Sequence, residues 1–188
     1  DVGFFSTTLL GQTTLVQPLK RSSAKPGERV YVQGTLGKSA AGLWVLLNHP
    51  EDRKKWSSLV EYHLSPVIKE RAGEALAEIQ SIGACIDISD GLSSELNHIA
   101  SSSRVQLVIE KESLPVDPEV LALSEYYGLS PYDFALNGGE EYQLLFTSSC
   151  SNSIFYNNDR IGPVYDIGYV QVGSGVEQIN SQGIVEQM

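Results

Sequence analysis

The chain has 188 residues, of which 41% are hydrophobic and 19% are charged, a balance typical of a globular protein with a sizeable buried core. The formal net charge of −10 argues against a broad surface for nucleic acid or anionic membrane, although acidic residues can hold the cations that bind phosphates. No apolar run approaches the roughly 20 residues of a membrane span. Cys85 and Cys150 lack metal-ligand spacing and fit a reducing compartment. We therefore expect a cytoplasmic protein with no nucleic-acid or membrane partner.

The start of the chain predicts a strand that belongs to a longer polypeptide. Residues 4–16 are rich in β-forming side chains, and the chain begins at Asp1, without a methionine, in what reads as part of this strand. The turn formers that follow indicate a connector. We expect residues 1–20 to be a remnant strand of a missing N-terminal domain plus this connector, and residues 21–188 to form one α/β domain.

Strands and helices mix along the rest of the chain. The clearest helix is predicted over 65–80, where apolar residues recur at the spacing of one buried stripe and Pro66 suits the first turn. The sequence predicts, in chain order, strand 29–35, helix 37–48 with Ser39 as its cap, helix 65–80, strand 84–88, helix 90–102, strand 105–110, helices 117–128 and 130–137, and strands 141–147 and 163–172. This order predicts an α+β fold (α/β-like) with a covered sheet.

Residues 83–100, GACIDISDGLSSELNHIA, place two acids at the boundary between a strand and a helix. Because side chains alternate along a strand, Cys85 and Asp87 share one face, and Asp87 leaves the sheet at its carboxyl end, the usual place for ligands in such sheets. Asp90 follows in the first helical turn, beside Gly91, where backbone N–H groups can meet an anion. Two carboxylates beside such a helix start suit a cation that bridges protein and phosphate.

The alternative is that Asp90 or Ser89 only caps the helix, which is the commoner role for either residue taken alone. Capping accounts for one acid and leaves Asp87 without a role. An EF-hand loop fits less well, because Gly91 stands where an oxygen ligand belongs. We therefore favour a metal–phosphate role for the two acids.

Two further sequence features, a pair of glycines and an arginine, each have two possible interpretations. In ALNGGEEYQLLFT, residues 135–147, the glycines at 138 and 139 either end a helix or let the chain approach a ligand at which Glu140 points. Arg21, in the basic connector, is either a solvated side chain or a phosphate clamp.

Four segments resemble one known family: RSSAKPGERVYVQGTLGKSAAGL, HLSP, CIDISDGLSSELNHIA and ALNGGEEYQLLFT follow the order and spacing of the thiamine-monophosphate kinase family. That family belongs to the superfamily of aminoimidazole-ribotide synthetase and selenophosphate synthetase. The resemblance runs from Asp1 to about Gly168, and the paired I-D-x-S-D-G-L and G-G-E-[DE]-Y motifs are its most specific part. It implies the superfamily's C-terminal domain, a mixed sheet with helices mainly on one face.

The resemblance also implies an activity, the ATP-dependent phosphorylation of thiamine monophosphate to thiamine diphosphate with Mg²⁺. By position in the motifs, the metal ligands would be Asp87, Asp90 and Asp1, the ATP contacts Arg21 and Ser89, and the substrate-side acid Glu140. The glycines that precede the family's aspartate at the position of Asp1 are absent here.

The chain also departs from the family pattern. We expect the family's N-terminal domain, which supplies further metal aspartates and the homodimer contact, to be missing, together with a C-terminal aromatic motif. Lys69 stands where an arginine is usual, and Glu95 and Glu141 replace aspartates. Two alternatives to the kinase follow: a non-catalytic nucleotide- or metal-binding module, and another ATP-using synthetase of the same superfamily.

Overall fold

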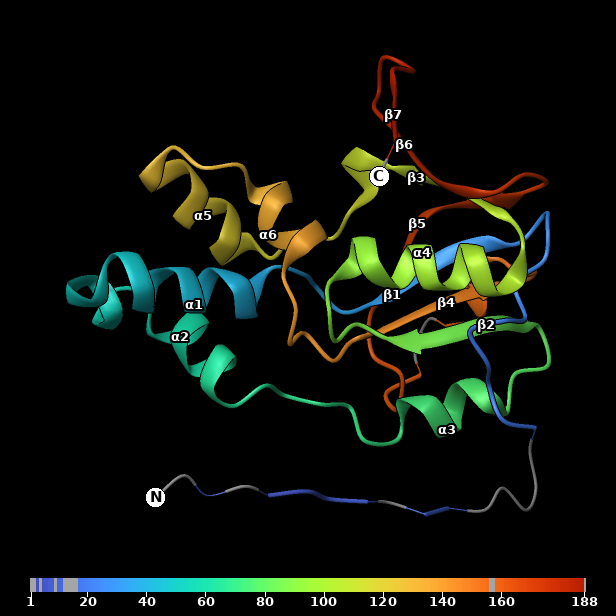
Figure 1. Cartoon of the computed structure of the whole chain (residues 1–188), viewed down its shortest axis with the longest axis horizontal. Helices are drawn as coiled ribbons and strands as arrows, with labels where there is room; N and C mark the ends of the chain where they lie inside the picture. The colour runs from blue at the N-terminus through green and yellow to red at the C-terminus, as the bar shows by residue number, and fades with distance from the viewer. Residues whose placement is uncertain (1–2, 4, 9, 12–16, 156–157, 188) are drawn as a thin grey trace.

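A mixed sheet of seven strands organises the part of the chain that the computed structural model describes, residues 3, 5–8, 10–11, 17–155 and 158–187. The strand order is β2-β4-β1-β5-β3-β6-β7, with β3 and β6 parallel and the other neighbours antiparallel (Figure 1). The strands are β1 (Arg29–Gln33), β2 (Ile82–Asp87), β3 (Gln106–Glu110), β4 (Leu144–Ser148), β5 (Val164–Gln171), β6 (Gly175–Ile179) and β7 (Val185–Gln187). This sheet confirms the α+β class.

Helices lie on the sheet and beyond one end of it (Figure 1). They are α1 (Lys38–Asn48), α2 (Ser57–Leu64), α3 (Ala72–Ala77), α4 (Leu92–Ser103), α5 (Pro118–Tyr127) and α6 (Pro131–Asn137). Helices α1, α2 and α5 share a small core of their own, which includes Val45, Leu59 and Leu123. In the described residues, no helix is both long enough and apolar enough to cross a membrane.

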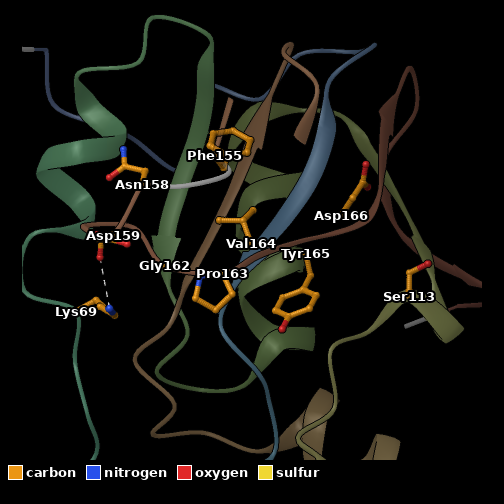
Figure 2. Close-up of a pocket in the computed structure, with 10 residues that line it drawn as sticks. All are labelled: Lys69, Ser113, Phe155, Asn158, Asp159, Gly162, Pro163, Val164, Tyr165 and Asp166. Atoms are coloured by element: carbon orange, nitrogen blue, oxygen red, sulfur yellow. Dashed lines mark hydrogen bonds between the residues drawn. The ribbon is translucent and has the colours of Figure 1, made fainter. Parts of the chain in front are cut away.

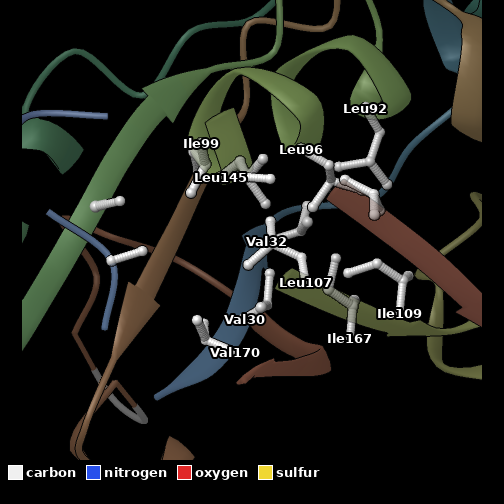
Figure 3. Close-up of a cluster of buried hydrophobic side chains, with 14 of the residues drawn as sticks. Val30, Val32, Leu92, Leu96, Ile99, Leu107, Ile109, Leu145, Ile167 and Val170 are labelled. Carbon is white, nitrogen blue, oxygen red and sulfur yellow. The ribbon is translucent and has the colours of Figure 1, made fainter. Parts of the chain in front are cut away.

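Helix α4 covers one face of the sheet and builds the main core. Leu92, Leu96 and Ile99 recur at i, i+4 and i+7, so they form one buried stripe that packs on Val32 of β1 and Leu107 of β3 (Figure 3). Each fully buried side chain of this kind contributes about 1.5–3 kcal/mol relative to an exposed one. The core therefore fixes where α4 begins, and with it the turn that carries Asp90.

The opposite face of the sheet holds an aromatic core. Tyr31 lies between Val30 and Val32 in β1 and so points away from α4. Its ring stacks on Phe146 with centroids 5.5 Å apart and meets Phe155 edge-on at 5.1 Å. Helix α3 packs here, so both faces of the sheet are covered over these strands.

Two expected elements differ from the structure. The helix predicted over 65–80 is formed only from Ala72 to Ala77, because Ala72, Ala75 and Leu76 are buried whereas Ile68 is 54% exposed and gives the preceding residues no anchor. The strand predicted over 4–16 is not seen in its described residues, 5–8, 10 and 11. A strand needs a paired neighbour, and Phe5 is 95% exposed.

Candidate functional site

The two sequence motifs meet at the carboxyl end of β2. Asp87 pairs with Leu144 across β2 and β4, and the backbones remain bonded beyond the strand end. The N–H of Ile88 donates to the carbonyl of Gln143 at 2.8 Å, and the N–H of Glu140 donates to the carbonyl of Ser89, also at 2.8 Å. Residues 87–91 and 139–143, distant in sequence, therefore form one site.

Glycines make this close approach possible. A Cβ at Gly139 would lie 2.6 Å from the carbonyl oxygen of Ser89, and one at Gly91 would lie 3.1 Å from the backbone of Asn137. Gly91 also has a φ of +106°, which disfavours other residues. Gly138, at the C-cap of α6, has an extended backbone rather than the left-handed one of a glycine cap. Gly138 therefore ends the helix, as the first interpretation has it, and Gly139 lets one segment of the chain approach another, whereas the approach of a ligand stays a prediction.

Asp87 and Asp90 both lie at the surface. Asp87 is the last residue of β2, as predicted, whereas Asp90 lies in the bend before α4 and not in its first helical turn, because the helix begins only after Gly91. The capping alternative is wrong, because α4 begins after Gly91 without any side-chain cap from Ser89 or Asp90. Instead the N–H of Asp90 donates to the carboxylate of Glu95 at 3.3 Å. Among the described residues, neither aspartate carboxylate accepts a hydrogen bond, so both are available to a ligand.

Glu140 and Tyr142 extend the same negative region. The hydroxyl of Tyr142 donates to the carboxylate of Glu140 at 2.6 Å. This bond, followed by burial and by the negative charges of Glu140, Asp87 and Asp90, raises the pKa of Tyr142. Glu140 and Tyr142 have φ values of 62° and 54°, a left-handed conformation that costs non-glycine residues about 1–3 kcal/mol each. Such strain indicates that the side chains are held in a required orientation.

Glu141, which lies between these two strained residues, is fully buried and anchors them to another element. One of its carboxylate oxygens accepts the N–H groups of Gly37 and Ser39, both at 3.0 Å, and so caps α1 from a distance. Burial raises the pKa of Glu141 to about 7, against the effect of those two bonds. The prediction that Ser39 caps α1 is wrong, because its hydroxyl bonds instead to Nδ1 of His63 at 3.0 Å.

A pocket of about 340 Å³ opens beside Glu140. Its walls come from α1, α6 and residues 138–140, with His63 of α2 at one side. Trp44 and Phe134 make part of the apolar wall. Gly139, which lines the pocket, lies against the backbone of Ser89 and Asp90, so the pocket adjoins the turn that carries Asp90.

A larger hollow of about 1000 Å³ lies at the aromatic core and holds none of the predicted site residues (Figure 2). Lys69 donates to the backbone oxygen of Asp159 at 3.5 Å, and Asp166 pairs with Arg29 at 2.7 Å. Neither sequence motif contributes to its lining, so we do not place the acid pair's ligand there.

Arg21 is a predicted site residue that the structure does not bring to the acid pair. The backbone oxygen of Arg21 accepts from Ser103 at 3.0 Å, which places Arg21 at the far end of α4 from Asp90. At about 1.5 Å per residue, the helix separates the two by well over 10 Å. Ser89 lies in the site, half-buried between the acids. Asp1 lies outside the described residues.

A second cluster of possible metal ligands was missed by the sequence reasoning. The ligand atoms of His49, Glu51 and Asp52 lie within 4.8 Å of one another, at the C-terminal end of α1. His49 already bonds Glu51 at 3.2 Å, and Asp52 accepts from Tyr127 at 2.5 Å. The short spacing H-x-E-D could have indicated this cluster. The sequence alone does not show that the hydroxyl of Tyr127 bonds Asp52.

Comparison with known proteins identifies relatives over most of the chain. A thiamine-monophosphate kinase of Aquifex aeolicus is 38% identical over 176 residues, which are 91% of this chain and 53% of that protein. The Escherichia coli K12 enzyme of the same name is 39% identical over 142 residues, 73% of this chain and 42% of that protein. The chain is a homologue of the thiamine-monophosphate kinases. It spans about half the length of the curated relatives it matches.

Solved structures agree with this homology to the thiamine-monophosphate kinases. A crystal structure of the Aquifex aeolicus kinase superposes with a TM-score of 0.76 at 34% identity, over 90% of this chain and 54% of that one. A structure described as AaThiL complexed with AMPPCP and TMP superposes with a TM-score of 0.73 at 36% identity. The match covers 85% of this chain and 50% of that chain. The hydrogenase maturation protein HypE of Escherichia coli, at 19% identity and a TM-score of 0.69, shares the fold. No protein-family model matches the chain.

Proposed function

We propose that the protein to which this chain belongs transfers the γ-phosphoryl group of ATP to thiamine monophosphate and so forms thiamine diphosphate. The observation that carries the proposal is the junction of residues 87–91 with 139–143, where free carboxylates adjoin a pocket for a small molecule. Support also comes from the relatives' names and from the neighbour that holds an ATP analogue with TMP.

The residues at this junction fit Mg²⁺. Asp87 and Asp90 present exposed carboxylates that the described residues leave without hydrogen bonds, and carboxylate oxygen is the ligand type Mg²⁺ prefers. Mg²⁺ bound to phosphates usually keeps several waters and takes only one or two carboxylates, so the two acids need not converge on one point. A cation bound there would offset the charge of the phosphates as they approach one another.

The chain's own groups would position the two substrates. Glu140, held by Tyr142, would orient the organic end of thiamine monophosphate in the adjoining pocket, with its phosphate toward Asp87 and Asp90. Ser89 would contact ATP from the same turn. The acceptor is a phosphate oxygen that is already ionised, so we assign no general base. Arg21, at the far end of α4, would reach ATP phosphates only if the nucleotide extends along the sheet.

A non-catalytic nucleotide- or metal-binding module is the second candidate, because the chain covers about half of its relatives. Calorimetry with Mg-ATP on the chain, followed by an assay of ADP release with thiamine monophosphate, separates the two. ADP release that depends on thiamine monophosphate supports the kinase. Mg-ATP binding without such release supports the module, and substrate-dependent turnover with another small molecule would support a different synthetase of the superfamily.

We also propose that the parent protein acts in the cytoplasm as a homodimer, as the family pattern implies. The free thiols of Cys85 and Cys150 agree with a reducing compartment. A sedimentation measurement on the parent protein tests the dimer.

A further inference from the structure

Glu95 is a buried acid in the first turn of α4, and the proposed phosphoryl transfer assigns it no role. Only 2% of its surface is exposed, whereas Asp87 and Asp90 lie at the surface. Its neighbours along the helix, Leu92 and Leu96, belong to the main core. A carboxylate at such a depth costs free energy unless hydrogen bonds or an opposite charge compensate it, so stability alone would favour an apolar residue here.

Glu95 holds the turn that carries Asp90. Its carboxylate accepts the N–H of Asp90 at 3.3 Å, and its own N–H donates to the carbonyl of Gly91 at 3.1 Å. On the other side of the turn, the carbonyl of Ser89 accepts the N–H of Glu140 at 2.8 Å. The backbone of the turn is therefore fixed from two sides, while the side chain of Asp90 stays exposed.

The carboxylate of Glu95 also adds to the negative charge of this turn. Asp90 and Asp87 lie near enough to repel it, and His98, three residues further along α4, attracts it. His98 is exposed, so solvent weakens that attraction. None of the ion pairs in the described part of the chain involves Glu95 or either aspartate. A cation at the acid pair would supply the positive charge that these residues do not.

We propose that Glu95 is a positioning residue for the cation site, which holds the Asp90 turn and contributes charge that a cation bound to Asp87 and Asp90 compensates. The inference rests on the proposed function, because that function brings the cation with ATP. Glu95 need not touch the cation, since hydrogen-bonding groups behind metal ligands act by orienting them. The same charge costs stability when no cation is bound, so metal affinity and stability should change in opposite directions when it is removed.

Two variants separate the hydrogen bond from the charge. Glu95→Gln keeps an acceptor oxygen for the N–H of Asp90 and removes the charge, whereas Glu95→Ala removes both. Glu125→Gln, which removes the same charge from an exposed position on α5, is the matched control. Mn²⁺ alone is titrated into the whole chain. Electron paramagnetic resonance of free Mn²⁺ gives the affinity, and broadening of backbone amide signals shows whether the ion lies at residues 87–91.

We expect Glu95→Gln to weaken Mn²⁺ binding by about tenfold and to leave the thermal unfolding midpoint of the metal-free protein unchanged or higher. Glu95→Ala should bind Mn²⁺ at least as weakly, and its Asp90 amide should exchange with solvent about tenfold faster, because its acceptor is gone. Glu125→Gln should change none of these quantities. A purely structural role for Glu95 predicts the reverse for Glu95→Gln, a lower midpoint with unchanged Mn²⁺ affinity.

Unchanged Mn²⁺ affinity in Glu95→Gln would overturn the inference, as would equal exchange of the Asp90 amide in the wild type and Glu95→Ala. Absence of Mn²⁺ from residues 87–91 at millimolar concentration would reject the cation site and the role of Glu95 with it. Failure of the proposed function gives a different result. Mn²⁺ binding with the expected loss in Glu95→Gln, but no phosphorylation of thiamine monophosphate by the parent protein, would reject the kinase and keep the role of Glu95.

Discussion

Two acidic clusters in this molecule have similar composition, but they differ in whether their carboxylate oxygens already accept hydrogen bonds. His49, Glu51 and Asp52 converge within 4.8 Å at the end of α1, yet His49 bonds Glu51 and Tyr127 bonds Asp52. Asp87 and Asp90 do not converge with Glu140 in this way, yet the described residues leave both carboxylates unbonded beside a pocket.

For a cation that arrives bound to phosphates, we expect the availability of carboxylate oxygens to matter more than their convergence. Such a cation brings oxygen ligands and water with it and needs only one or two carboxylates from the protein. The cluster at α1 uses its acids to hold the helix end together with His49 and Tyr127. We therefore expect changes at Asp87 and Asp90 to alter ligand binding, and changes at Glu51 and Asp52 to alter stability.

The largest expected effect comes from the acid pair. In the full-length parent protein, Asp87→Asn should lower turnover with ATP and thiamine monophosphate by about 100-fold or more, because one oxygen ligand of the cation becomes a neutral amide. In this chain, the same change should weaken Mg-ATP binding in calorimetry. Glu51→Gln is the matched control at the other cluster. An Asp87→Asn protein with near-normal turnover would remove the metal role.

A backbone change at the junction should have the next largest effect. Gly139→Ala places a Cβ 2.6 Å from the carbonyl oxygen of Ser89, which is backbone and cannot rotate away. We expect the free energy of unfolding to fall by about 1–3 kcal/mol and ligand binding to be lost with it. Gly73→Ala, on α3 with open space around it, is the control and should stabilise by about 0.5–1 kcal/mol. Equal denaturation midpoints for both variants would contradict the close approach.

Removal of the buried anchor should have a smaller and graded effect. Glu141→Ala leaves the N–H groups of Gly37 and Ser39 without their acceptor, and we expect a loss of about 1–3 kcal/mol in urea unfolding. Glu141→Gln keeps an acceptor oxygen at the same place, so its free energy of unfolding should fall by less. If both variants unfold at the wild-type urea concentration, Glu141 does not hold the turn.

The same residue predicts the smallest effect, a dependence of stability on pH. The pKa of Glu141 is raised from 4.5 to about 7 in the folded protein, so between these values the folded state holds a proton that the unfolded chain has lost. The contribution of this group to stability should therefore decrease as pH rises from about 4.5 to 7. The slope of unfolding free energy against pH should be less negative in Glu141→Gln than in the wild type. An unchanged slope would assign the dependence to other groups.

The sequence predicted the parts of the fold that local pattern decides. The stripe of Leu92, Leu96 and Ile99 predicted α4, and the alternation around Asp87 predicted the end of β2, whereas Asp90 lies just before α4 and not in its first turn. The helix over 65–80 was overextended, because its first half has the apolar period but no surface on which to pack Ile68. Periodicity indicates which face can be buried, whereas burial itself depends on distant elements.

The exposed acids of the candidate site could be predicted from the sequence, but the buried hydrogen bonds that hold them in place could not. Glu141 was noted only as a departure from the family pattern, and its role depends on α1, about a hundred residues earlier in the chain. The bond between Ser39 and His63 likewise joins two helices. Single-sequence spacing carries no information on such contacts, so it predicts Ser39 only as a cap and does not predict its bond to His63.

The central claim is that Asp87 and Asp90 hold the cation that accompanies ATP. The most direct test replaces Mg²⁺ by Mn²⁺ with a non-hydrolysable ATP analogue and records which backbone amide signals broaden in the NMR spectrum of the chain. We predict that broadening is centred on residues 87–91 and 139–142. Broadening centred on residues 49–52, with the signals of Asp87 and Asp90 unaffected, would contradict the account.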